Sequence, residues 1–131
     1  MRISQEADYA FRIIHYLSNM TGEDKNDAKS IAETLNIPHR FAVKILRKLS
    51  LGGFVKAKRG AKGGYGLNMP SNEITFLKVV ECIDGPLYIN KCLKDVSLCS
   101  DNRNGACYVH EKLQEVNKTV KDMLSKITFE N

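Results

Sequence analysis

Residues 30–67 read SIAETLNIPHRFAVKILRKLSLGGFVKAKRGAKGGYGL, and this stretch decides the fold. It opens on a capping-box pattern, Ser30 to Glu33, which predicts the start of a short helix. Asn36 can end that helix in the left-handed conformation, and Pro38 suits the first turn of the next helix. The glycine pair at 52 and 53 stops this second helix. The pattern therefore predicts two short helices joined by a tight turn.

The helix after Pro38 has one apolar face and one basic face. We expect the apolar face to pack on the rest of the domain and the basic face to stay in solvent. The apolar positions are Phe41, Ala42, Ile45, Leu46 and Leu49, and the basic face carries His39, Arg40, Lys44, Arg47 and Lys48.

A β-hairpin with a basic tip follows this helix. Residues 54–58 alternate apolar and basic side chains, as a half-buried strand does, and a return strand starts at Tyr65. The glycine-rich segment 60–64 forms the turn between them. The order helix, turn, basic helix, basic hairpin is that of a winged helix-turn-helix, whose second helix enters the major groove of DNA. The predicted fold class is mainly α with a small β-hairpin wing.

Helices are also predicted on both sides of this unit. One starts at a cap on Ser4, and another covers residues 75–84. A long C-terminal helix starts near Cys107, and its apolar residues are spaced 4 and 3 apart, as in a coiled-coil seam. These residues are Val109, Leu113, Val116, Val120, Met123 and Ile127. We expect this helix to form a homodimer, with residues 1–70 as the DNA-binding domain and 71–131 as the dimerisation domain.

The positive charge is concentrated in the central stretch. The chain has 131 residues and a formal net charge of +5, and residues 34–72 contain eight Lys or Arg but no Asp or Glu. Such a segment attracts polyanions, and a two-fold dimer favours double-stranded DNA with a near-palindromic operator. No catalytic motif is present, so we do not expect an enzyme. No apolar run is long enough for a membrane span and no signal peptide is evident, which predicts a cytoplasmic protein.

Three cysteines and a histidine follow one another in a polar loop of about residues 86–107 and the helix after it. Cys92, Cys99, Cys107 and His110 have the spacing Cys-x6-Cys-x7-Cys-x2-His. Three thiolates and an imidazole can hold Zn²⁺ or an iron–sulfur cluster. Alternatively, the cysteines are small buried hydrophobic side chains in a reducing cell. The remaining cysteine, Cys82, has apolar neighbours and is expected to pack in the core.

The sequence resembles the Rrf-two family of bacterial transcription regulators over nearly its whole length. The resemblance is carried by MRIS-x4-YAFR at the start, by residues 30–67 with their RG-x3-GGY wing, and by the cysteine loop with its long helix. It implies a dimeric winged helix-turn-helix repressor. By position, Arg59 matches the wing arginine that enters the minor groove. The other residues expected at the DNA are Lys58 and Lys62 on the wing and His39, Arg40, Lys44 and Arg47 on the recognition helix.

Within this family, three cysteines in the loop mark the members that bind a cluster, commonly 2Fe–2S. Cys92, Cys99 and Cys107 match them in order. His110 matches the fourth ligand of IscR-like members, whereas Asp8 matches the aspartate that NsrR-like members lend from the first helix of the partner subunit. The resemblance implies a regulator that senses nitric oxide, redox state or iron–sulfur supply through a 2Fe–2S cluster.

Two other functions remain open. A cluster-free member of the CymR type would regulate sulfur or cysteine metabolism, and would respond through a thiol or a partner protein. A module of a different class would hold Zn²⁺ on the cysteine loop for stability, and would use its basic face to bind nucleic acid or an acidic protein. The metal content of the purified protein distinguishes these functions from cluster sensing.

Overall fold

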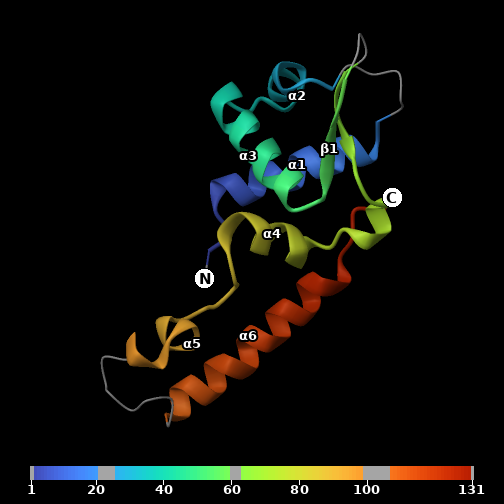
Figure 1. Ribbon diagram of the computed structural model, residues 1–131. Helices are drawn as coiled ribbons and strands as arrows, with labels where there is room; N and C mark the ends of the chain where they lie inside the picture. Colours follow the sequence, from blue (N-terminus) through green and yellow to red (C-terminus); the bar gives the residue numbers. More distant parts are fainter. Residues whose placement is uncertain (1, 21–25, 60–62, 99–106, 131) are drawn as a thin grey trace.

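The computed structural model describes residues 2–20, 26–59, 63–98 and 107–130. It is mainly helical and carries a two-stranded antiparallel sheet, so the predicted fold class is confirmed (Figure 1). In chain order the elements are α1 (Gln5–Ser18), α2 (Ala28–Leu35), α3 (His39–Leu51), β1 (Val55–Lys58), β2 (Gly64–Leu67), the 3₁₀ helix η1 (Ser71–Glu73), α4 (Phe76–Asp84), α5 (Lys91–Lys94), the 3₁₀ helix η2 (Val96–Leu98) and α6 (Tyr108–Lys126).

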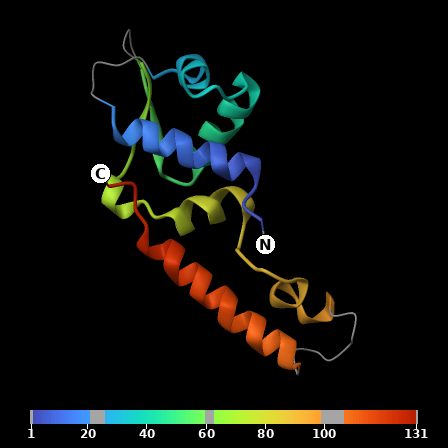
Figure 2. The ribbon, with the colours of Figure 1, turned by 180° about the vertical axis from the view of Figure 1, so that it is seen from behind.

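The molecule is elongated. Helices α1, α2 and α3 and the β-hairpin form a compact body at one end, with α4 packed beneath α1 (Figures 1 and 2). Helix α6 runs away from this body, and the short α5 lies beside its first half at the far end (Figure 1). No helix within the described ranges is long and apolar enough to cross a membrane.

The hydrophobic core lies between α1, α3 and α4. Ile13 and Ile14 of α1, Ile45 of α3 and Val79 of α4 are fully buried there. Removing a side chain of this size from water stabilises a fold by about 1.5–3 kcal/mol. The buried stripe of α3 comprises Ala42, Ile45, Leu46 and Leu49, four of the five residues predicted, whereas Phe41 is only half-buried. The basic face is turned to solvent.

The structure corrects the predicted start of the second helix. Asp27, and not Ser30, is the N-cap of α2, and its side chain accepts a hydrogen bond from the backbone N–H of Ser30 at 2.7 Å. Aspartate and serine are about equally favourable N-caps, and the earlier cap lengthens the helix by most of a turn. The capping box predicted at Ser30 to Glu33 is therefore wrong, because Ser30 already lies inside the helix.

Three other predicted helix ends are confirmed. The Ser4 hydroxyl accepts a hydrogen bond from the backbone N–H of Ala7 at 3.0 Å, which caps α1. Asn36 has the left-handed conformation, with φ 54° and ψ 46°, and α3 ends at Leu51 with Gly52 as its C-cap. These caps give partners to backbone groups that a helix end leaves unpaired. They fix where the turn between α2 and α3 begins and ends.

The wing is attached to the start of the helix-turn-helix unit. The Tyr65 backbone N–H donates to the carbonyl oxygen of Asn26 at 2.8 Å. A Cβ atom on Gly64 would lie 2.4 Å from the carbonyl carbon of Asn26, and Gly64 has φ +143°. Only glycine fits a position that is both this close to another backbone and in this conformation. The hairpin therefore keeps one orientation relative to α2.

Residues 85–98, the described part of the segment after α4, contain regular structure where a polar loop was predicted. This part contains α5 and η2, and its first residues are attached to α6. The Asn117 side chain accepts from the backbone N–H of Ile89 at 2.9 Å and donates to the carbonyl oxygen of Leu87 at 3.2 Å. The prediction missed α5 because a helix of four residues gives no periodic signal.

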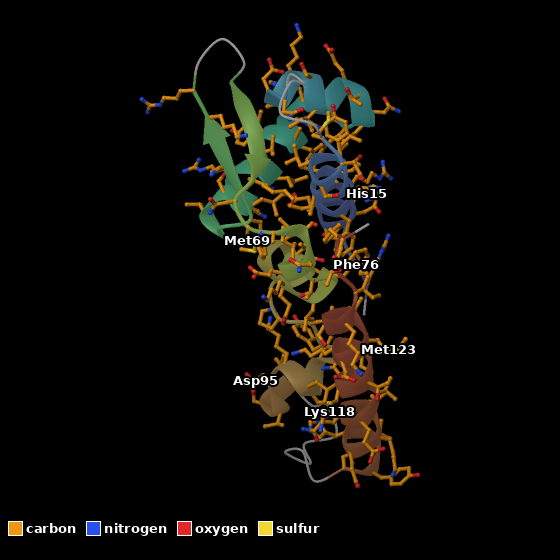
Figure 3. The ribbon with its side chains drawn as sticks, turned by 90° about the vertical axis from the view of Figure 1, so that its right-hand side faces the viewer. His15, Met69, Phe76, Asp95, Lys118 and Met123 are labelled. Carbon is orange, nitrogen blue, oxygen red and sulfur yellow. The ribbon has the colours of Figure 1, made fainter. Side chains whose placement is uncertain are left out.

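The end of the chain returns to the body. The Phe76 backbone N–H donates to the carbonyl oxygen of Ile127 at 2.9 Å, and Thr75 pairs with Thr128 in a β-bridge. The Phe129 ring is buried and stacks on Phe76 with 4.7 Å between ring centroids (Figure 3 labels Phe76). This contact fixes the C-terminal end of α6 to the first turn of α4.

The apolar seam predicted on α6 is divided between two environments. Leu113 and Val120 are half-buried on the side of α6 that faces its own chain. The others are exposed: Val109 by 57%, Val116 by 50%, Met123 by 62% and Ile127 by 44%. None of the residues of α6, all of which the structure describes, is fully buried. The chain thus leaves an apolar stripe of its longest helix uncovered.

Candidate nucleic-acid interface and cysteine site

The basic residues predicted on the recognition helix share the solvent face of α3. His39, Arg40, Lys44 and Arg47 are all exposed. They face solvent because the opposite side of α3 supplies four buried residues to the core. Val43 is 44% exposed among them, and a small apolar group on such a face can contact a thymine methyl group.

The wing presents a second basic surface. Lys58 ends β1 and Arg59 follows it, and both side chains are exposed. Side chains that end in nitrogen project from the hairpin away from the body (Figure 3). Lys62 lies outside the described residues. A helix with a basic face and a basic hairpin beside it are the two parts that a winged helix-turn-helix applies to the grooves of DNA.

The cations of α3 differ in their partners. Lys44 Nζ donates to Glu6 Oε1 at 2.9 Å and Lys48 Nζ donates to Glu6 Oε2 at 3.2 Å. The hydrogen bonds from Lys44 and then Lys48 hold the pKa of the Glu6 carboxyl below its ordinary value. The Arg40 guanidinium lies over the Phe41 ring, 4.9 Å from its centroid. Arg47 has no ion-pair partner among the residues that the structure describes.

The residues predicted to bind a cluster lie around the contact between α5 and α6. Cys92 is on α5, Cys107 is the N-cap of α6, and His110 is in the first turn of α6. Both of these cysteines are free thiols and are half-buried. Cys99 lies outside the described residues. Within the described part of the chain, no three His, Cys, Asp or Glu side chains come together as metal ligands.

His110 has the property expected of a ligand. Its Nδ1 atom is buried and has no hydrogen-bond partner among the described residues. A buried polar atom without a partner costs about 1–3 kcal/mol, which is recovered when the atom coordinates a ligand. Thiols and an imidazole are also the donors that an iron–sulfur cluster takes. The residues present at this end of α6 therefore fit such a cluster.

Asp8 and Cys82 lie elsewhere in the chain. The Asp8 carboxylate pairs with Arg12 at 2.7 Å on α1, in the body and away from the α5 end of the molecule (Figure 1). Within one chain it does not join the other predicted ligands. The Cys82 sulfur lies 3.6 Å from the Lys48 carbonyl oxygen, and burial raises the pKa of its thiol. Cys82 belongs to the packing around the core, as predicted.

Sequence reasoning did not identify two residues around these sites. Glu6 lies 38 residues before Lys44, and no local pattern connects the two. Asn117 lies seven positions after His110 on α6, and it holds the segment that leads into α5. Asn117 lies next to Val116 but outside the predicted apolar seam, so the heptad pattern gave no signal for it.

Comparison with known proteins gives a consistent set of similarities. The family model Rrf2, described as "Iron-dependent Transcriptional regulator", matches residues 3–131. An HTH-type transcriptional regulator of Mycobacterium tuberculosis is 38% identical over 87 residues, which are 66% of this chain and 54% of that protein. The HTH-type transcriptional regulator CymR of Bacillus subtilis is 33% identical over 95 residues, 72% of this chain and 69% of CymR. The chain thus spans about half the length of the mycobacterial relative.

Solved structures agree with these similarities. The structure of CymR, "the Global Cysteine Regulator of B. subtilis", matches with a TM-score of 0.80 and 27% identity, over 98% of this chain and 93% of that one. The structure of T. potens IscR matches with a TM-score of 0.76 and 22% identity, over 98% of this chain and 83% of that one, which shows a shared fold. The relatives named here are transcriptional regulators and not enzymes.

Proposed function

Because the chain belongs to the Rrf2 (Rrf-two) family of transcriptional regulators, we propose that it binds double-stranded DNA through α3 and the wing. The observation that carries this proposal is the solvent face of α3, where four basic or titratable side chains stand over a fully buried apolar stripe. Such a helix is held rigidly by the core while its outer face can enter the major groove. The exposed Arg59, which directly follows β1, would add a contact in the minor groove.

We propose further that the protein acts as a homodimer on a near-palindromic operator. Val109, Val116 and Met123 are seven residues apart and exposed, so they form a straight apolar stripe along α6. The same stripe on a second copy would cover it with two-fold symmetry. Two copies of α3 would then contact two half-sites of one operator.

The DNA-binding proposal is tested by the salt dependence of affinity. Removing one side chain that binds a phosphate should make the slope of log K against log salt shallower by about 0.9. Arg47→Ala should therefore reduce the slope by about one and weaken binding about five- to tenfold at 0.1 M salt. The measurement is fluorescence anisotropy on a mixed-sequence duplex of about 30 base pairs. Lys118→Ala, on the exposed surface of α6 (Figure 3), is the matched control and should leave the slope unchanged. Equal effects of the two changes would contradict the proposed interface.

The regulatory signal is proposed to act at Cys92, Cys99, Cys107 and His110. A 2Fe–2S cluster held there would supply a centre that nitric oxide, oxygen or loss of iron can destroy. The buried, unpartnered Nδ1 of His110 supports this proposal, and so does the position of Cys107 one turn before His110. Asp8 of the partner subunit is the alternative fourth ligand. A cluster bound by these side chains would hold α5 and α6 together. The DNA-binding body is attached to the other end of α6.

Cluster binding is tested on protein purified without oxygen. We expect a visible charge-transfer absorption with matching iron and sulfide, and Cys92→Ala or Cys107→Ala should lower iron content to below about a tenth of the wild-type value. Cys82→Ala, whose thiol packs near the core, is the control that should keep the absorption. His110→Ala should keep part of the iron but lose it faster in air. A cluster content that none of these changes affects would contradict the assignment of the site.

The similarity to CymR supports a second candidate, in which the protein regulates sulfur or cysteine metabolism without a cluster and responds through a thiol or a partner protein. Cys92 and Cys107 are free thiols, which a response through a thiol would use. A colourless protein that stays free of iron after reconstitution with iron and sulfide would favour this candidate. A colourless protein loaded with zinc would instead favour a zinc-stabilised module.

A further inference from the structure

We propose that Glu6 is a specificity-determining residue of the DNA-binding surface, which lowers the affinity of α3 for DNA of any sequence by pairing with Lys44 and Lys48. The proposal rests on the DNA binding proposed above. The proposed effect of Glu6 is on the part of the DNA affinity that comes from contacts with phosphates. Sequence-independent binding is almost entirely electrostatic, so a carboxylate that neutralises lysines of the recognition helix reduces it directly.

The geometry shows one carboxylate shared between two ammonium groups. Glu6 Oε1 accepts from Lys44 Nζ at 2.9 Å, and Glu6 Oε2 accepts from Lys48 Nζ at 3.2 Å. Lys44 and Lys48 are one turn apart on α3, on the side that faces α1, and Glu6 is in the first turn of α1. Both oxygens of the carboxylate are therefore used, one for each lysine.

These side chains are accessible to a DNA backbone. The side chain of Lys44 is 56% exposed, that of Lys48 is 36% exposed and that of Glu6 is 26% exposed. Neither lysine is confined to the interior, so a phosphate and the Glu6 carboxylate compete for the same ammonium groups. A glutamate carboxylate is already charged at neutral pH at its ordinary pKa, and the hydrogen bonds from Lys44 and Lys48 lower the pKa of Glu6 further. The Glu6 carboxylate therefore competes with DNA phosphates for the two lysines at physiological pH.

The remaining cations of α3 are differently placed. Arg47 has no ion-pair partner among the described residues, and Arg40 stacks on the Phe41 ring. The planar guanidinium of arginine can bind a guanine edge with two hydrogen bonds as well as a phosphate, whereas the ammonium of lysine is a compact point charge. Glu6 thus offsets the charge of the two lysines and does not offset that of the arginines. This arrangement favours recognition of bases over attraction to any DNA.

The test compares Glu6→Gln with the wild-type protein on a mixed-sequence duplex of about 30 base pairs, by anisotropy at several salt concentrations. Glutamine has the same shape without the charge. Freeing one lysine for a phosphate should steepen the slope of log K against log salt by about 0.9 and tighten binding about five- to tenfold at 0.1 M salt. Exposed ion pairs contribute little to stability, so the variant should melt at nearly the wild-type temperature.

Glu115→Gln is the matched control. Glu115 also pairs with a lysine, Lys112 at 3.7 Å, but it lies on α6 away from the DNA-binding body. The two changes alter the net charge equally. We expect the control to change the affinity less than about twofold, because charges farther apart than the Debye length are largely screened.

A third comparison separates pairing from simple repulsion between Glu6 and DNA. Glu6→Gln is introduced into a protein that already carries Lys44→Gln and Lys48→Gln. If Glu6 acts through the lysines, its replacement should tighten binding less than about twofold in this background. The same five- to tenfold gain in both backgrounds would show direct repulsion and would overturn the proposal.

The outcomes also separate this proposal from the DNA-binding function itself. A wild-type protein that binds the duplex, together with a Glu6→Gln variant that binds equally well or more weakly, overturns the role of Glu6 alone. A wild-type protein that shows no salt-dependent binding to the duplex overturns both. The proposal is supported if Glu6→Gln tightens binding in the wild-type protein but not in the protein that carries Lys44→Gln and Lys48→Gln, and if Glu115→Gln does not tighten binding.

Discussion

Val116→Asp is expected to split the proposed homodimer into monomers and to weaken binding to a two-half-site operator by roughly 100-fold or more. Val116 is the central residue of the exposed stripe on α6, with Val109 seven residues before it and Met123 seven residues after it. A charge at the centre of a symmetric apolar interface faces its own copy and loses its hydration. Without the partner, each α3 binds its half-site alone, and the gain from two linked half-sites disappears.

The measurement is molar mass by light scattering, followed by affinity for a DNA selected from a random pool with the wild-type protein. Lys118→Asp is the control, because Lys118 is exposed two positions further along α6, on a different side of the helix. It should remain dimeric. Circular dichroism should show the same helix content in both variants, since no residue of α6 is fully buried in its own chain. A dimeric Val116→Asp protein would place the interface on another surface.

Phe129→Ala is expected to lower the free energy of unfolding by about 3–5 kcal/mol, the usual cost of removing a buried aromatic ring. Phe129 is 4% exposed and stacks on Phe76, which stacks in turn on Phe11 with 4.6 Å between centroids. Its loss leaves a cavity among three elements that are far apart in the sequence. It also removes the ring stacking from the attachment of the C-terminal end of α6 to the body, which is then held by backbone hydrogen bonds of residues 127–129.

Urea denaturation at a fixed protein concentration measures this effect, since the proposed dimerisation would make stability depend on concentration. Thr128→Ala is the control: Thr128 contributes its backbone to the bridge with Thr75, so the loss of its side chain should cost less than about 1 kcal/mol. A change below about 1 kcal/mol for Phe129→Ala would mean that the end of the chain contributes little to the fold.

The features that could be predicted from the sequence are local ones. Ser4 and Asn36 end helices through contacts with residues three or four positions away. The buried stripe of α3 follows from a period of 3.6 residues, and the hairpin follows from alternation and a glycine-rich turn. The candidate DNA surface could be predicted for the same reason. Its residues lie on successive turns of one helix, α3, and on the hairpin that follows it in the chain.

The features that could not be predicted are contacts between distant parts of the chain. The pairing of Glu6 with two lysines of α3, the stacking of Phe129 on Phe76 and the attachment of Leu87 to Asn117 each join residues from different elements. The start of α2 was mistaken because two good caps, Asp27 and Ser30, lie three positions apart, and sequence alone did not rank them. Contacts of these kinds depend on the tertiary arrangement, which a sequence pattern does not contain.

Helix α6 is attached to different parts of the chain at its two ends, so a movement at one end tilts the helix about the other end. Its 19 residues span about 28 Å, with the cysteines at one end and the anchored Phe129 at the other. A displacement of about 2.5 Å at the cysteine end corresponds to a tilt of about 5° at the anchored end. In the proposed dimer the tilts of the two copies would add, so a movement at the cysteine end smaller than the rise of one base pair, about 3.4 Å, would change the separation of the two recognition helices that contact the two half-sites.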